Sequence, residues 1–231
     1  MSICATEQYS MEQIFENKGN IYTFLNPVSY LTALDNQQLF GQFDGIFADG
    51  ALLVRAIRKM YGIQVTRRSF DMTSMTPQLF AYAVSHRKTI YIVASTQSQE
   101  EKAVELLEQR YPGVVFAGHR NGYFASEEDM DQEAKYICEV NPDFLIVGMG
   151  TLVQEKFLLK VKNAGFRGIG FSCGAFIRQI AKTGIDYYPA WVDRMNLRFV
   201  YRIWKEPHTR KRYVKAGILF PLRFFWERLQ G

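Results

Sequence analysis

Cysteine, histidine and long apolar runs are all scarce in this sequence. Its 231 residues include three cysteines, Cys4, Cys138 and Cys173, and three histidines, and neither set has the spacing of a disulfide framework or a zinc site. No apolar stretch approaches the roughly 20 residues that span a bilayer. The first residues also lack the basic-then-apolar plan of a secretory signal. We therefore expect a protein that is made in the cytoplasm and stays there, without a zinc centre.

Positive charge is concentrated at one end of the chain. The formal net charge is +5, but residues 196–231 alone contain nine Lys and Arg against two Glu, a local charge of +7. The rest of the chain therefore sums to −2. A hydrophobic content of 48% with 22% charged residues is typical of a folded globular protein. The basicity thus belongs to a C-terminal segment attached to a nearly neutral core.

Short apolar runs alternate with helical patterns over roughly the first 185 residues. The strand candidates are Ile21–Leu25, Phe43–Ala48, Thr89–Ala94, Val114–Ala117, Phe144–Gly148 and Gly168–Phe171. The helix candidates are Pro27–Asp35, Ala51–Tyr61, Pro77–His86, Gln99–Arg110, Glu127–Val140, Val153–Ala164 and Ala175–Thr183. Repeated strand, helix, strand units predict an α/β fold, a Rossmann-like open and mostly parallel sheet with helices on both faces.

The amino-acid composition changes at about Pro189. From there on the sequence is rich in aromatic and basic residues and has a helical pattern, with a strand signal only at Gly217–Phe220. We therefore divide the chain into an α/β core, residues 1–188, and a C-terminal appendage, residues 189–231. Basic and aromatic residues together favour docking on an anionic membrane surface. Packing of the aromatic side chains on the core, or binding of nucleic acid, would give the same composition.

Several polar residues and glycines directly follow predicted strands, where open parallel sheets bind their ligands. Asp49 follows the second strand and is either the N-cap of the next helix or a general base. Gly148 and Gly150 open a helix whose amino terminus suits a phosphate, but a third glycine is missing from the dinucleotide fingerprint. Ser95–Gln97 are either helix caps or nucleotide contacts. Arg67 is suited to a diphosphate or simply to solvent.

Taken in order, these segments resemble the WecG/TagA/CpsF family of glycosyltransferases. The resemblance runs from about Ile21 to Tyr213 and rests on Asn26, the Asp49-Gly50 pair, Arg67 with Asp71, and three longer motifs. Those motifs are YPGVVFAGHRNGYF at 111–124, NPDFLIVGMGTLVQE at 141–155 and YRIWKEPHTRKRY at 201–213.

The resemblance implies a fold of the type called GT-E and an inverting sugar transfer that uses neither metal nor cofactor. Asp49 would be the catalytic base. The substrate-binding residues would be Asn26, Arg67, Asp71, Gln154, Gly148, Gly150, Arg202, Arg210 and Arg212. The implied partners are a UDP-sugar donor, a polyprenyl-diphosphate-linked acceptor and the inner face of the cell membrane. No nucleic acid is expected, and a homo-oligomer is possible.

The chain departs from the family pattern at Phe24, Leu152, Val153 and Ile177, which leaves the donor sugar open. The stretch YYPAW at 187–191 is more similar to the capsule and exopolysaccharide members. Two other classes stay open on the residues alone. One is an NAD(P)-dependent oxidoreductase built on Gly148 and Gly150, and the other is a non-catalytic nucleotide or lipid binder of the same fold.

Overall fold

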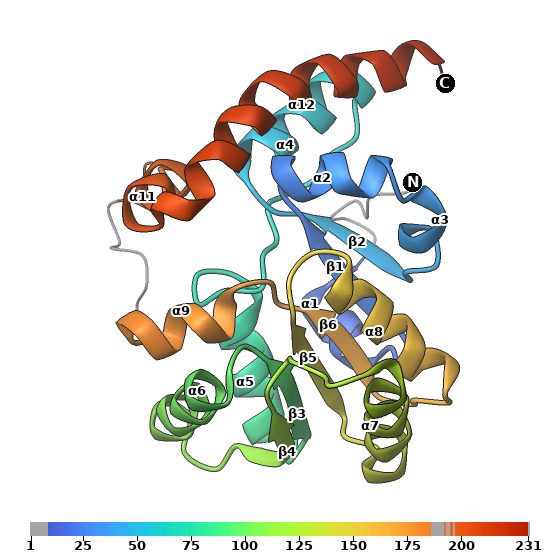
Figure 1. Ribbon diagram of the computed structural model, residues 1–231, viewed down its shortest axis with the longest axis vertical. Helices are drawn as coiled ribbons and strands as arrows, with labels where there is room; N and C mark the ends of the chain where they lie inside the picture. The colour runs from blue at the N-terminus through green and yellow to red at the C-terminus, as the bar shows by residue number, and fades with distance from the viewer. Residues whose placement is uncertain (1–8, 186–191, 193–194, 196, 231) are drawn as a thin grey trace.

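Six short strands, each at a predicted apolar run, form one parallel sheet with helices on both of its faces (Figure 1). The computed structural model describes residues 9–185, 192, 195 and 197–230. The strands are β1 Ile21–Leu25, β2 Gly45–Ala48, β3 Thr89–Ala94, β4 Val115–Arg120, β5 Phe144–Gly148 and β6 Ile169–Ser172. The α/β, Rossmann-like fold expected from the sequence is therefore confirmed, with every strand pair parallel.

The helices follow the alternation that the sequence predicts. Those of the core are α1 Met11–Glu16, α2 Pro27–Leu34, α3 Gln37–Phe40, α4 Ala51–Tyr61, α5 Met75–Ser85, α6 Gln97–Arg110, α7 Glu127–Val140, α8 Val153–Asn163 and α9 Phe176–Thr183. The short helices α1 and α3 were not predicted. The C-terminal segment forms α11 Arg198–Lys205, a 3-10 turn η2 Pro207–Thr209, and α12 Arg210–Gln230.

The strand order is β2-β1-β6-β5-β3-β4. It differs from the order 3-2-1-4-5-6 of the dinucleotide-binding fold. Strands β5 and β6 return to the middle of the sheet and separate β1 from β3. Because every strand pair is parallel, the carboxyl ends of all six strands converge on one edge of the sheet. That convergence positions the site described below.

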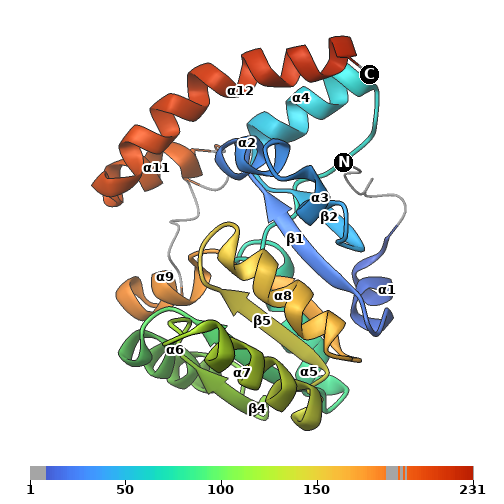
Figure 2. The same ribbon diagram turned by 45° about the vertical axis from the view of Figure 1, so that its right-hand side comes forward.

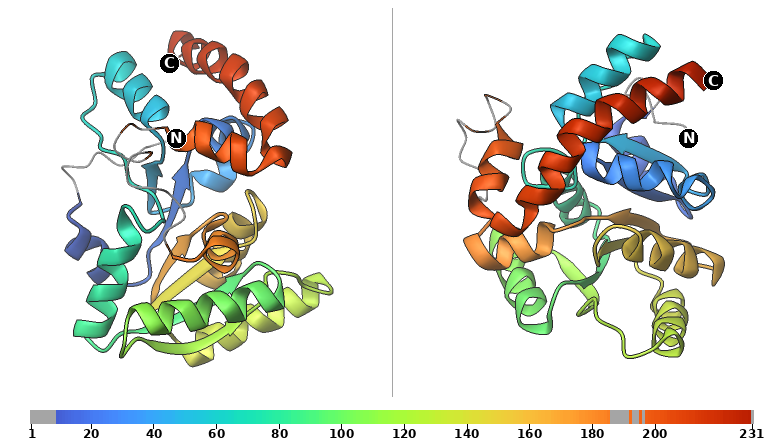
Figure 3. Two further views of the ribbon diagram at one scale, coloured as in Figure 1. Left: turned by 90° about the vertical axis from the view of Figure 1, so that its left-hand side faces the viewer. Right: turned by 45° about the horizontal axis from the view of Figure 1, so that its top comes forward.

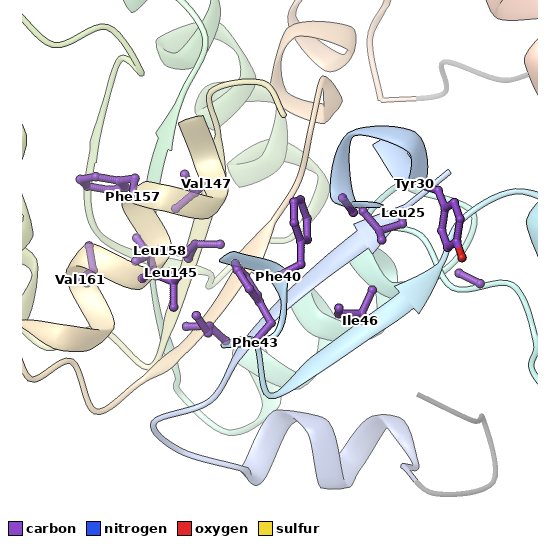
Figure 4. Close-up of a cluster of buried hydrophobic side chains, with 14 of the residues drawn as sticks. Leu25, Tyr30, Phe40, Phe43, Ile46, Leu145, Val147, Phe157, Leu158 and Val161 are labelled. Atoms are coloured by element: carbon purple, nitrogen blue, oxygen red, sulfur yellow. The ribbon is translucent and has the colours of Figure 1, made fainter. Parts of the chain in front are cut away.

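Two hydrophobic cores lie on opposite faces of the sheet, as the period of two along each strand requires. On one face, Leu25 and Leu145 pack against α2, α3, α7 and α8, and Figure 4 shows this cluster around Phe40 and Phe157. On the other face, residues such as Phe171 pack against α1, α5, α6 and α9. Strands buried on both faces explain why the sequence shows continuous rather than alternating apolar runs.

The appendage packs on the core through one side of α12, which lies beside α2 and α4 (Figure 2). Phe220 and Phe224 are almost fully buried against Tyr30 of α2, with ring centroids 5.6 and 5.3 Å from its ring. Arg223 of α12 pairs with Asp35 at 2.7 Å. The strand signal at Gly217–Phe220 was wrong, since these residues belong to a continuous helix. The proposed boundary between residues 188 and 189, and the stretch 187–191, lie outside the described residues.

Candidate active site

The carboxyl ends of the strands surround a pocket of about 380 Å³. Its wall combines residues that follow each of the six strands with residues of the appendage. Of the residues singled out in the sequence, the pocket is lined by Asn26, Asp49, Asp71, Gln154, Gly148, Gly150, Arg202 and Arg212. The structure therefore brings most of the expected site together at the sheet edge where open parallel sheets bind ligands.

Asp49 lies at the end of β2 and is about 30% exposed, with its exposed part on the pocket. It does not act as a helix cap, because the N-cap of α4 is Gly50, whose φ of 109° suits glycine, and no side chain caps this helix. The pKa of Asp49 is raised to about 6, with burial as the largest cause. The charge of Asp71 also acts to raise it, whereas Arg67 and Arg202 act to lower it. The result is a carboxylate suited to accept a proton near neutral pH.

Arg67 links the two carboxylates of the pocket. Its Nη2 lies 2.7 Å from Asp71 Oδ2 and 3.3 Å from Asp49 Oδ1. Asp71 is held in turn by Ser69, whose hydroxyl donates to it at 2.8 Å, and by Arg198 of the appendage at 3.0 Å. Arg67 itself does not line the pocket, so it orients Asp49 and Asp71 from behind.

Asn26 is the N-cap of α2. Its Oδ1 accepts hydrogen bonds from the backbone N–H groups of Val28 at 2.9 Å and Ser29 at 3.1 Å. The side-chain oxygen is therefore used in the fold, and a ligand would be met by the Nδ2 group.

Gln154 joins two loops of the pocket. Its Oε1 accepts from the backbone N–H of Gly174, after β6, and its Nε2 donates to Glu155 at 2.8 Å. Glu155 is fully buried, and burial raises its pKa, although it also accepts from Thr23 of β1 at 2.9 Å and from the Leu152 N–H at 2.7 Å. This buried network fixes the ends of β1, β5 and β6 relative to one another.

Gly148 and Gly150 form the start of the loop into α8. A Cβ atom at Gly148 would lie 2.6 Å from Cys173 Sγ, so no side chain fits between β5 and β6 at this point. The close approach brings the amino ends of α8 and α9 to the same wall of the pocket, through Thr151 and Ala175. Helix amino termini present N–H groups and partial positive charge, which suits a diphosphate.

The appendage supplies the cationic side of the pocket. Arg202 of α11 and Arg212 of α12 line it, together with Tyr213. Burial raises the pKa of Tyr213, whose surroundings include Arg202 and Asp49. Arg210 does not reach the pocket, because it is exposed and its Nε donates to the carbonyl of Ile203.

Glu206 connects this segment to the core. Its carboxylate accepts from Arg178 at 2.9 Å and from Gln179 at 3.1 Å, both on α9, and it lies 3.5 Å from Arg202. Figure 3 shows the C-terminal helices, in red, beside α2, in blue, and the Glu206 contacts tie this segment to α9 as well. Arg178, Gln179 and Arg202 all line the pocket, so a single carboxylate behind the wall holds three of its polar side chains.

Comparison with known proteins places this site in a family. The model of the glycosyl transferase WecG/TagA/CpsF family matches residues 2–231. The chain belongs to this family of glycosyltransferases. Both the family expected from the sequence and the enzyme class are therefore confirmed, and the family match favours sugar transfer over a nicotinamide-dependent oxidoreductase or a non-catalytic binder.

Curated relatives of the WecG/TagA/CpsF family extend over most of the chain. It is 31% identical, over 95% of its own length and 92% of the relative's, to a UDP-Gal:alpha-D-GlcNAc-diphosphoundecaprenol beta-1,4-galactosyltransferase of Shigella boydii. It is 24% identical, over 84% and 75% of the two lengths, to an N-acetylglucosaminyldiphosphoundecaprenol N-acetyl-beta-D-mannosaminyltransferase of Bacillus subtilis. A Staphylococcus aureus protein of that same name is 29% identical over 85% and 78%.

The departures from the family pattern fall in different surroundings. Phe24 lines the pocket. Ile177 is 1% exposed and packs in the core. Val153 is 44% exposed on the first turn of α8, and the N–H of Leu152 is held by Glu155. Of these positions, Phe24 is the one that changes the pocket wall.

Arg178, Tyr213 and Ser95 line the pocket but were not among the predicted site residues. Ser95 follows β3, and the strand-end rule had already directed attention to it as a cap or a nucleotide contact. Thr96 is the N-cap of α6 without a side-chain bond, and the Ser95 hydroxyl donates to Gln99. Tyr213 lay inside a family motif, whereas Arg178 gave no sequence signal. Among the described residues, no group of three His, Cys, Asp or Glu could hold a metal ion.

Proposed function

We propose that this protein transfers a hexosyl group from a UDP-sugar to N-acetylglucosamine carried on a polyprenyl diphosphate, by a direct displacement that inverts the anomeric carbon without a metal ion. The observation that carries the proposal is Asp49, a carboxylate with a pKa of about 6 in a pocket that is also lined by Asp71, by three arginines and by the amino ends of α8 and α9. The names of the relatives support these substrate classes, and they differ in the donor sugar.

In the proposed reaction, Asp49 takes the proton from an acceptor hydroxyl while that oxygen bonds to the anomeric carbon of the donor. The bond between this carbon and the UDP oxygen breaks, and UDP leaves with the electron pair. Arg202 and Arg212, with the amino ends of α8 and α9, stabilise the charge that grows on the diphosphate. Asn26 and Gln154 orient the sugar, and Arg67 orients Asp49.

The test is UDP release from a panel of UDP-sugars, with and without a short-chain polyprenyl-diphosphate N-acetylglucosamine acceptor. We expect acceptor-dependent release that is lowered by roughly two to four orders of magnitude in Asp49→Asn, since general base catalysis contributes about that much. Wild-type turnover in Asp49→Asn would remove Asp49 as the base. Binding of UDP without turnover of any donor would instead indicate a non-catalytic protein.

We further propose that the appendage docks on an anionic membrane at the inner face of the cell membrane, where a lipid-linked acceptor is presented. One face of α12 packs on the core. The opposite face carries a stripe of exposed apolar residues, whose spacing of three to four residues places them on the same side of the helix. It consists of Val214, Ile218, Leu222, Phe225 and Trp226, each at least 54% exposed. Lys211 and Lys215 are exposed on the same helix. No helix in the described part of the chain is long and apolar enough to cross a bilayer.

Docking is tested by sedimentation with vesicles of phosphatidylglycerol and phosphatidylcholine. We expect Leu222→Glu with Trp226→Glu to abolish binding at unchanged UDP affinity. Tyr136→Glu, which alters an exposed aromatic residue on α7, is the matched control and should bind as the wild type does. If the double variant changes the oligomeric state measured by light scattering and still binds vesicles, the stripe is a subunit interface instead.

A further inference from the structure

One wall of the pocket is aromatic. Phe24, Phe70 and Phe176 all line it, and their rings contact one another edge to face, with centroids 5.9 Å apart for Phe24 and Phe70 and 5.5 Å for Phe70 and Phe176. Phe70 and Phe176 are buried, at 5% and 4% exposed, whereas Phe24 is partly exposed. Phe24 is therefore the ring of this wall that is most accessible to a ligand.

The Phe24 ring is held firmly in place. Phe24 is the register partner of Phe47 on β2, so the two side chains lie on the same side of the sheet, with ring centroids 5.5 Å apart. With Phe70 packed against its edge as well, turning the ring out of the pocket would open a void between two strands. The platform exists before the ligand binds, which reduces the entropy lost on binding.

Phe24 also lies close to the proposed base. The backbone N–H of Asp49 donates to the carbonyl of Leu25, the residue after Phe24, at 2.8 Å. Because a base must contact the hydroxyl that attacks the anomeric carbon, the donor sugar has to lie next to Asp49. Phe24 and Asp49 line the same pocket, so a donor sugar bound next to Asp49 would have the Phe24 ring within reach.

A phenyl ring accepts C–H groups and offers no hydrogen bond to a hydroxyl, whereas Asn26, Ser69, Asp71 and Gln154 supply the polar part of the wall. The bound hexose must then be amphipathic, with hydroxyls toward the polar part and C–H bonds toward Phe24. A galacto-configured pyranose has this property. Its axial O4 leaves the hydrogens of C3, C4 and C5 together on one face, whereas in the gluco epimer the C4 hydrogen points to the other face.

We propose that Phe24 is a specificity-determining residue that stacks on the apolar face of the donor hexose and selects a galacto-configured UDP-sugar. The proposal rests on the proposed function and narrows its substrate class. It assigns to the aromatic wall the recognition of the sugar, and to the helix termini and arginines that of the diphosphate.

The test compares kcat/KM for UDP-galactose and its 4-epimer UDP-glucose in the wild type, Phe24→Leu and Phe24→Thr. We expect the wild type to prefer UDP-galactose, and both variants to reduce that preference roughly tenfold, the effect of one aromatic stacking contact. The inhibition constant of UDP alone should stay within about twofold, because UDP lacks the hexose. Tyr123→Leu, which removes an exposed aromatic residue that lines the pocket after β4, at the other end of the strand order from β1 and β2, should leave the preference unchanged.

A second measurement does not require turnover. Saturation-transfer NMR with UDP-galactose should show the strongest transfer at the C3, C4 and C5 protons for the wild type, and a weaker and more uniform pattern for Phe24→Leu. An unchanged sugar preference in both variants, or a wild-type preference for UDP-glucose or an N-acetylated donor, overturns the role of Phe24 and leaves the proposed transfer standing. Absence of both UDP binding and turnover with every donor overturns the proposed function itself, and the role of Phe24 with it.

Discussion

Replacing Asp49 by asparagine should stabilise the protein at neutral pH while it lowers turnover by roughly two to four orders of magnitude. Burial raises the pKa of Asp49 from its ordinary value of 3.8 to about 6, which means that the fold disfavours the ionised form. Asparagine is neutral and nearly isosteric, and its amide oxygen can still accept from Arg67, which lies 3.3 Å away. The variant thus removes an unfavourable charge and retains the shape.

The magnitude follows from the pKa. A rise of roughly two pKa units corresponds to about 3 kcal/mol. Because the carboxylate is 30% exposed to pocket water, we reduce this to about 2 kcal/mol. The folded-state pKa lies above the unfolded value, so the associated stability is fully present below about pH 4 and is lost as the pH rises through about 6. The variant should therefore gain its advantage above pH 6, as an increase in Tm of roughly 4–8 °C.

The assay is thermal and urea unfolding of both proteins from about pH 4 to about pH 8. Asp71→Asn is the control and should lower the stability of the protein, since Asp71 accepts from Arg67 at 2.7 Å and from Arg198 at 3.0 Å. Turnover of the wild type should also fall about tenfold per pH unit below 6, in kcat/KM. The reasoning would be refuted if Asp49→Asn were no more stable than the wild type at about pH 8. It would also be refuted if the stability advantage of the variant were as large at about pH 4 as at about pH 8.

Two further variants test how the appendage is held. Glu206→Gln weakens the charge-assisted bond from Arg178 at 2.9 Å, so it should raise the KM for the donor roughly tenfold and lower stability by about 1–2 kcal/mol, as steady-state kinetics and urea unfolding would show. Phe224→Ala truncates a side chain that is 3% exposed between α12 and the core, and should cost about 3–5 kcal/mol in urea unfolding or detach α12, which limited proteolysis would reveal as early cleavage near the C-terminus.

The sequence was sufficient to locate the sheet. The runs Ile21–Leu25, Thr89–Ala94 and Phe144–Gly148 coincide with β1, β3 and β5, because strands buried on both faces are apolar throughout and are bounded by polar residues. The apolar run Gly217–Phe220 misled for a related reason, since a short apolar run does not distinguish a strand from a helix. Its helical state depends on Phe220 packing against the core, which is not a local property.

Some residues of the site could be predicted from the sequence, whereas others depend on tertiary packing. Asn26, Asp49 and Gly148 could be predicted, because the carboxyl ends of parallel strands meet at one edge whatever the details of packing. Arg178 could not, because its position depends on how α9 meets the appendage through Glu206. The distinction between Arg210, outside the pocket, and Arg212, inside it, depends on where α12 begins, which the sequence pattern did not fix.

The appendage has two opposing effects on the pKa of Asp49. Arg202 lowers the pKa of Asp49 by its charge, while burial, to which Arg202 and Tyr213 contribute as part of the pocket wall, raises it. Burial is the larger effect. A carboxylate left in open water would keep its ordinary pKa and be a weaker base. The packing of the appendage over the sheet edge therefore favours the proposed base and also brings in the arginines that we propose for the leaving diphosphate.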